Sequence, residues 1–145
     1  SYRSRQMADA APLNQRPCVV YCKTGVRFDR IAPAGMRLMS ALEHAARSCH
    51  VPLTITCGTE AHASKDPHTK GEAYDVRSRG FTASQKTAVL RSLMEWLSED
   101  PFRDPVIEAS GGYATQYFFA FLELADTNQQ HFHIQRRRNR VYPPV

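Results

Sequence analysis

Long apolar runs are missing from this sequence of 145 residues. No stretch approaches the roughly 20 apolar residues that a membrane-spanning helix needs, so we expect no membrane span. The first 17 residues also lack the apolar centre of a signal peptide, and we interpret them as a flexible, polar N-terminal arm. Internal repeats and low-complexity segments are absent as well. These absences favour an ordinary globular protein over a membrane, fibrous or repeat protein.

Cysteine is scarce, with four residues at irregular spacing, Cys18, Cys22, Cys49 and Cys57. Disulfide scaffolds are typical of shorter, cysteine-dense chains, so we expect buried free thiols instead. The segment between Cys18 and Cys22 has the composition of a strand, and no second pair of Cys or His follows at zinc-finger spacing. A zinc site at this pair is therefore not predicted.

Positive charge is unevenly distributed, because four arginines of a chain with net charge +5 lie within residues 136–140. Two interpretations of residues 136–145 are open: a solvated basic tail, or a segment that attaches to a polyanion such as nucleic acid or an anionic cell-wall polymer. No nucleic-acid-binding motif accompanies the arginines, so nucleic acid is not an expected partner. The remaining residues, 18–135, are sufficient for one domain with its own hydrophobic core.

Hydrophobic periodicity predicts two helices. The first covers residues 36–49, with Met36, Met39, Leu42, Ala46 and Cys49 as its apolar stripe. The second begins at a capping box formed by residues 82 and 85 and ends before residue 101, with Trp96 in its buried stripe.

Five or six strands are expected from alternation and from β-branched or aromatic runs. They are "CVVYC", "LTIT", "AYDVRS", "VIEAS", "YFFAFLEL" and "HFHIQ", and the turn-forming segments "GGYAT" and "ADTNQQ" connect the last three. Because most of these strands are neighbours in sequence, we predict a single α+β domain with a mostly antiparallel sheet and two main helices.

Two separate segments carry candidate metal ligands. In "HFHIQ", His131 and His133 are two residues apart and share one face of a strand, whereas the apolar residues between and after them face the other way. In "HTKGEAYD", His68 and Asp75 offer two more donors, and Gly71 lets the chain turn or approach an ion closely. Zinc readily takes imidazole nitrogen and carboxylate oxygen. Either these side chains converge on a metal, or they are surface histidines and a strand aspartate without a ligand.

"HTKGEAYD" fits the pattern HxxGxAxD, and together with the later HxH it resembles the signature of the M15 family of zinc peptidases. The fold of that family is shared with the amino-terminal signalling domain of Hedgehog proteins, and the likeness covers about residues 53–135. The resemblance implies one zinc ion per chain, bound by His68, Asp75 and His133. It also implies that His131 stands beside the metal and donates a hydrogen bond to a developing oxyanion.

The resemblance implies a function as well. Members of this family hydrolyse peptide bonds that involve D-amino acids, or other unusual linkages, in the peptidoglycan of bacterial cell walls. A compact chain with a basic C-terminus suits a bacteriophage endolysin, because cell walls are anionic.

The sequence departs from the family where the catalytic base is expected. Family members place a glutamate shortly before the last zinc histidine, but residues 127–130 contain no carboxylate. Glu123 and Asp126 are the nearest, and a hairpin would bring Glu123 beside His131 on the next strand, so Glu123 is the preferred base. If neither carboxylate reaches the centre, the domain would instead be a non-catalytic metal-binding module with a structural or attachment role.

Two further departures concern the loop before the first ligand. Asp66 replaces a common serine, and we expect it to accept a hydrogen bond from an imidazole N–H. Thr59 and Glu60 stand where carboxypeptidase members have an arginine for the substrate carboxylate, which favours an endopeptidase. His62 is expected to be an ordinary loop histidine.

Overall fold

The computed structural model describes residues 15–60, 62–100, 107–109 and 112–144. They contain two helices and seven strands. The helices are α2 (Pro33–Cys49) and α3 (Ala83–Leu97). The strands are β1 (Val20–Cys22), β2 (Leu53–Cys57), β3 (Ala73–Arg77), β4 (Ile107–Ala109), β5 (Gly112–Ala114), β6 (Phe118–Glu123) and β7 (His131–Arg136).

All seven strands form one sheet in the order β1-β2-β3-β7-β6-β5-β4. Only β1 and β2 are parallel, and every other neighbouring pair is antiparallel. The predicted α+β fold with a mostly antiparallel sheet is therefore confirmed. The prediction of five or six strands is wrong by at least one, because β5 lies within "GGYAT", which was expected to be a turn. Glycine is needed there, since a Cβ on Gly112 would lie 2.6 Å from the carbonyl oxygen of Ala120 on β6.

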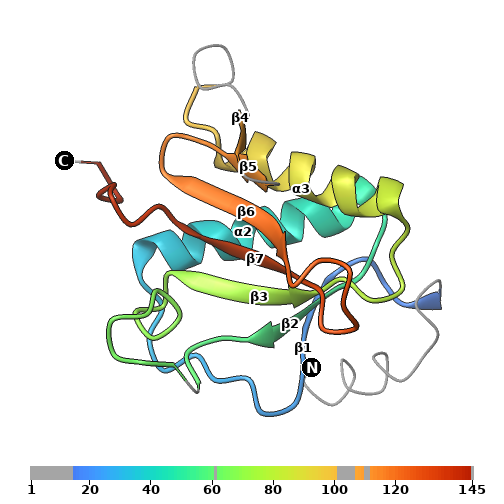
Figure 1. The fold of residues 1–145 in the computed structure, drawn as a ribbon, viewed down its shortest axis with the longest axis horizontal. Helices are drawn as coiled ribbons and strands as arrows, with labels where there is room; N and C mark the ends of the chain where they lie inside the picture. The colour runs from blue at the N-terminus through green and yellow to red at the C-terminus, as the bar shows by residue number, and fades with distance from the viewer. Residues whose placement is uncertain (1–14, 61, 101–106, 110–111, 145) are drawn as a thin grey trace.

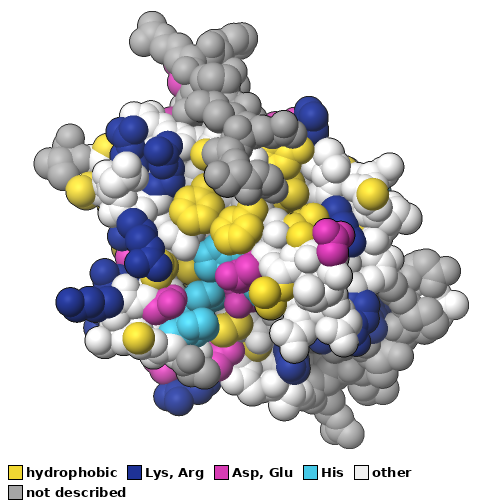
Figure 2. Space-filling view, viewed as in Figure 1, with side chains coloured by type: hydrophobic (Ala, Val, Ile, Leu, Met, Phe, Trp, Pro, Cys, Tyr) yellow, Lys and Arg dark blue, Asp and Glu magenta, His cyan; other side chains and the backbone are white. Residues whose placement is uncertain are grey.

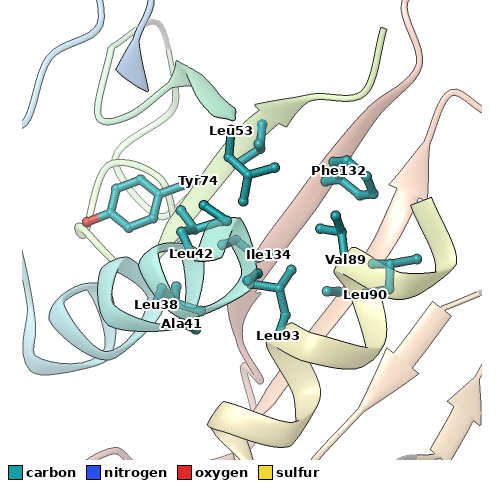
Figure 3. Packing of buried hydrophobic residues seen from close by; sticks show 14 of the residues in the cluster. Leu38, Ala41, Leu42, Leu53, Tyr74, Val89, Leu90, Leu93, Phe132 and Ile134 are labelled. Carbon is teal, nitrogen blue, oxygen red and sulfur yellow. The ribbon is translucent and has the colours of Figure 1, made fainter. Parts of the chain in front are cut away.

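The two helices pack side by side on one face of the sheet, and neither helix of the described residues covers the other face (Figure 1). Alternation along β3 and β7 points Tyr74, Val76, Phe132 and Ile134 toward the helices, and all four are fully buried. Figure 3 shows three of these strand residues, Tyr74, Phe132 and Ile134, among leucines of both helices. The hydrophobic core therefore lies between the helices and one face of the central strands, and the opposite face is available for a functional site.

The predicted stripe of the first helix is partly wrong. Leu42 and Ala46 are buried as expected, but Met36 is 63% exposed. Contact with the sheet is made instead by a line of residues that includes Leu38 and Ala45, both fully buried. Because apolar residues occur on more than one side of this helix, periodicity alone selects the wrong side at its start.

The second helix begins at the predicted capping box, in which Thr82 accepts from the Gln85 N–H and Gln85 accepts from the Thr82 N–H. The placement of Trp96 in the core is wrong, because this residue is 41% exposed. Its indole N–H donates to Ser40 Oγ at 2.8 Å, and its ring stacks on His44 with 4.7 Å between centroids. Trp96 thus connects the two helices at the surface, as its polar N–H permits.

The C-terminal segment packs against the sheet, contrary to the prediction of a solvated basic tail over residues 136–145. Arg136 ends β7 and forms an ion pair with Glu72, and Arg137 donates to the Thr115 carbonyl at 3.0 Å. Tyr142 stacks edge-on against Phe118, with 5.0 Å between ring centroids. Only Arg138 and Arg140 of the four arginines are exposed.

The predicted N-terminal arm, residues 1–17, falls largely outside the described part of the chain. Neither α2 nor α3, the helices of the described residues, has the length and apolar character needed to cross a membrane. The four cysteines form no disulfide with one another, but the prediction that they are buried is wrong: Cys22 is exposed, and the other three are half-buried.

Candidate metal centre

The uncovered face of β3, β7 and β6 carries the predicted ligand residues in register. Asp75 on β3 pairs with His133 on β7, and His131 on β7 pairs with Glu123 on β6. Their neighbours along each strand point into the core, so these four side chains project from the opposite face. Figure 2, drawn from that side, shows histidines and acidic residues gathered at the centre of the face, next to a group of hydrophobic side chains.

His68 is brought to this face by the loop between β2 and β3, and Gly71 fixes where the loop lies. Gly71 has a φ of +71°, and its carbonyl oxygen accepts from the Ala32 N–H at the start of α2. A Cβ on Gly71 would lie 2.2 Å from the carbonyl oxygen of Arg30. The predicted turn at Gly71 is confirmed, but the close backbone approach is to Arg30 and not to a metal ion.

Replacing Gly71 with alanine is expected to lower the free energy of unfolding by at least about 2 kcal/mol, because positive φ and a backbone clash act together. The matched control is Gly25→Ala, where φ is +94° but nothing lies within 4 Å of an added Cβ. The control should lose about 1 kcal/mol, the cost of the positive φ alone. Chemical denaturation of both variants gives the comparison, and equal losses would contradict the proposed clash.

Three donor atoms converge at this point. Asp75 Oδ1 lies 2.9 Å from His133 Nδ1 and 3.2 Å from His68 Nε2, and all three atoms lie within 4.8 Å of one another. In a tetrahedral zinc site with bonds of about 2.0–2.1 Å, ligand atoms are separated by roughly 3.3 Å. The spacing therefore fits a metal ion, and these three residues could hold one.

In both His68 and His133, one ring nitrogen is hydrogen-bonded to a carbonyl oxygen, and the other ring nitrogen, which faces Asp75, is available to a metal ion. His68 Nδ1–H donates to the Gly58 carbonyl at 3.1 Å, and His133 Nε2–H donates to Gln135 Oε1 at 2.7 Å. Gln135 is itself oriented, because its amide N–H donates to the Arg136 carbonyl. Carbonyl oxygens only accept, so His68 Nε2 and His133 Nδ1 keep their lone pairs when the rings are neutral.

The role predicted for Asp66 is wrong in detail. Its carboxylate accepts from the backbone N–H of His68 at 2.9 Å, whereas the imidazole N–H of His68 finds the Gly58 carbonyl. Asp66 thus holds the backbone of the loop rather than the ring.

His131 and Glu123 lie at the edge of the centre. His131 Nε2 is 2.7 Å from Glu123 Oε2 and 3.6 Å from Asp75 Oδ1, and its Nδ1 is 2.9 Å from the Gln129 carbonyl. Both ring nitrogens of His131 therefore face oxygen acceptors. Glu123 Oε2 is also 3.9 Å from His133 Nδ1. Asp126, the other candidate base, is exposed in the turn after β6.

The electrostatics of the centre favour a charged carboxylate. Burial alone would raise the pKa of Asp75, but hydrogen bonds with His133 and His68 outweigh it and hold this pKa well below its ordinary value. Burial likewise opposes charge on His133, yet its hydrogen bonds to Asp75 and Gln135 raise its pKa above the ordinary value. In the metal-free protein, a proton on His133 thus partly neutralises Asp75, and a bound cation would replace that proton.

His62 is not an ordinary loop histidine. Its ring stacks on His68 with 4.2 Å between centroids and an angle of 6°, and its Nε2 is 3.0 Å from Cys57 Sγ. These three residues form another group whose donor atoms are close enough for a metal. However, one ion cannot lie in the planes of two parallel stacked rings, so His62 more simply covers His68. Burial, together with Glu60 and nearby aspartates, raises the pKa of Cys57 to about 12 and keeps it a thiol.

Two clefts meet at the centre, and Asp75 lines both. The first, which we call the aromatic cleft, has a volume of about 320 Å³ and is walled by Phe119 and Phe121 beside His133 and Glu123. The second has a volume of about 410 Å³ and extends past His131. A ligand lying along the open face would therefore pass directly over the centre.

The structure brings together all five residues singled out from sequence: His68, Asp75, Glu123, His131 and His133. Cys57, His62 and Gln135 belong to the same neighbourhood and were missed. Gln135 carried a usable signal, since it lies two residues after His133 on the same strand face. No protein-family model, curated protein or solved structure matches the chain.

Proposed function

We propose that this protein is a zinc-dependent peptidase that hydrolyses peptide bonds of bacterial peptidoglycan. The observation that carries the proposal is the convergence of His68, Asp75 and His133 on one point with the Glu123 carboxylate beside it. Three protein ligands and a nearby acid or base are typical of catalytic zinc sites, which keep one coordination position open. The choice of a cell-wall substrate rests on the resemblance of HxxGxAxD and HxH to the M15 peptidases.

His68, Asp75 and His133 would hold the zinc ion through Nε2, a carboxylate oxygen and Nδ1. Bound zinc supplies Lewis acidity and lowers the pKa of water toward about 7. In this proposal Glu123 would accept the proton of the attacking water and pass it to the leaving amine. His131 would exchange its contact with Glu123 for an N–H hydrogen bond to the oxygen on which negative charge develops. The Glu123–His131 contact of 2.7 Å keeps both groups at the same edge of the centre.

A digestion of purified peptidoglycan tests this function. Zinc-loaded protein should release new amino groups from the cell walls, and a chelator should stop the release until zinc is added back. A loaded protein, verified to contain zinc, that releases no more amino groups than buffer from cell walls of several types would contradict the peptidase.

A metal-binding attachment module is the second candidate, and one contact favours it. Glu123 Oε2 contacts His131 Nε2 at 2.7 Å, and the Glu123 side chain is 41% exposed. An effective general base would instead have an unoccupied carboxylate that is shielded from bulk water. In this case the protein should bind zinc and sediment with cell walls, but leave their peptides intact. The digestion above, combined with co-sedimentation, separates the two functions.

A further inference from the structure

The second cleft beside the candidate centre is lined by cations. Its walls include Lys23 after β1, Arg77 at the end of β3 and Arg79 in the following turn. The other lining residues are Thr56, Asp75, Asn128, Gln129, Gln130 and His131. Asp75 is the single acidic residue in this set, and its carboxylate is already bound to His68 and His133. The cleft therefore carries an excess of positive charge.

These cations differ in their contacts from Arg27 and Arg136. Arg27 pairs with Asp29, and Arg136 pairs with Glu72. In the described part of the chain, by contrast, the side chains of Lys23, Arg77 and Arg79 have no ion pair with a carboxylate. Three unneutralised cations around one hollow raise the local concentration of anions and favour their binding there.

Of the three cations, Arg77 is the one whose position on a strand relates it directly to the metal centre. It is two residues after Asp75 on the same strand face, and it pairs in register with His131. Two residues along a strand span about 6.6 Å. An anion bound by the Arg77 guanidinium would therefore lie roughly one to two residues of an extended peptide away from the bond held at the centre. A guanidinium binds a carboxylate through two parallel hydrogen bonds, which fixes direction as well as charge.

We propose that this basic cleft, with Arg77 as its main contact, binds a free carboxylate of the substrate within about two residues of the scissile bond. The inference rests on the proposed peptidase function and adds to it a substrate class and a direction. The part of the substrate that carries the carboxylate occupies the basic cleft, and the part beyond the scissile bond lies in the aromatic cleft against Phe119 and Phe121. Arg77 is thus a specificity residue that contacts substrate without taking part in proton transfer.

The experiment compares two synthetic peptides on zinc-loaded protein. They share one sequence that the wild type cleaves, but the carboxylate nearest the scissile bond is replaced by a carboxamide in the second. Arg77→Gln should raise KM for the carboxylate peptide at least tenfold and leave its kcat within about threefold, because Arg77 binds substrate without touching the reacting atoms. The carboxamide peptide should respond less than twofold. Arg77→Lys, which keeps the charge but loses the paired hydrogen bonds, should fall between wild type and Arg77→Gln.

Arg91→Gln is the matched control, since Arg91 is an exposed arginine of α3 on the other side of the sheet. It should change KM for neither peptide. Metal analysis of each variant verifies that zinc is retained, so that a loss of activity caused by missing zinc is not mistaken for weaker binding of the carboxylate in the basic cleft. Equal effects of Arg77→Gln on both peptides, or equal effects of Arg77→Gln and Arg91→Gln, would overturn the proposal.

A binding measurement separates failure of the cleft from failure of the enzyme. If the wild type cleaves no peptide, the peptidase function fails, and calorimetric titration of a synthetic peptidoglycan stem peptide with a free carboxylate, and of its carboxamide counterpart, then tests the cleft alone. Tighter binding of the carboxylate peptide, abolished by Arg77→Gln, would support the cleft even without hydrolysis. Equal binding of both peptides by the wild type would overturn it.

Discussion

Bound zinc is expected to fall from about one ion per chain to less than about 0.1 when His133 is replaced by alanine. The change removes one of the three ligands and leaves His68 and Asp75 as the remaining two. Substituting even an outer hydrogen-bond partner of a zinc ligand costs about 10–100-fold in affinity, and loss of the ligand itself costs more. Metal analysis after dialysis against a weak chelator measures the effect.

His50→Asn is the matched control for this prediction. His50 is an exposed histidine at the end of α2 with a φ of 53°, a conformation that asparagine accepts well. It should keep its zinc. Full zinc in His133→Ala, combined with loss of zinc in Cys57→Ala, would instead place the metal at the group formed by Cys57, His62 and His68.

Hydrolysis of peptidoglycan is expected to fall about 10²–10⁴-fold in Glu123→Gln, the usual contribution of a general base. The amide keeps the size of the side chain and can still contact His131, but it cannot accept a proton. Because Glu123 is not one of the three converging donors, zinc content should stay near one ion per chain. Release of amino groups from cell walls and metal analysis of the same samples give the two readings.

Asp126→Asn is the control for Glu123→Gln. Asp126 has a φ of 65° in the turn after β6, and asparagine tolerates this conformation, so folding should be unaffected. Its activity should match wild type. Loss of activity in Asp126→Asn with normal activity in Glu123→Gln would transfer the role of base to Asp126, and full activity in both would exclude both carboxylates.

Much of the centre could be predicted because it lies on regular strands. Alternation along residues 73–77 and 131–135 separates core positions from site positions, so the shared face of Asp75 with His133 follows from the sequence pattern. The capping box of α3 is equally local, since all its atoms belong to two residues, Thr82 and Gln85, that are three positions apart. Trp96 and Met36 were misplaced because burial of an amphipathic or flexible side chain depends on what packs against it, which no local pattern contains.

The pairing of Glu123 with His131 was only one of several possible registers. The connecting turn includes Leu124 and Asp126 at positive φ, and a leucine gives no indication of that conformation. The contacts of His62 and Cys57 could not be predicted either, because they arise where an aperiodic loop folds back on the end of β2. The basic cleft joins Lys23, which follows β1, with residues of β3 and of the turn before β7, and these segments meet only in the folded sheet.

The middle strands of the sheet divide their side chains between two independent surfaces. Tyr74 and Ile134 contribute to the buried packing, whereas Asp75 and His133, their immediate neighbours in sequence, contribute to the open face. Because the two sets of side chains do not share a surface, substitutions at open-face positions of β3 and β7 should disturb the hydrophobic core less than substitutions at Tyr74 or Ile134.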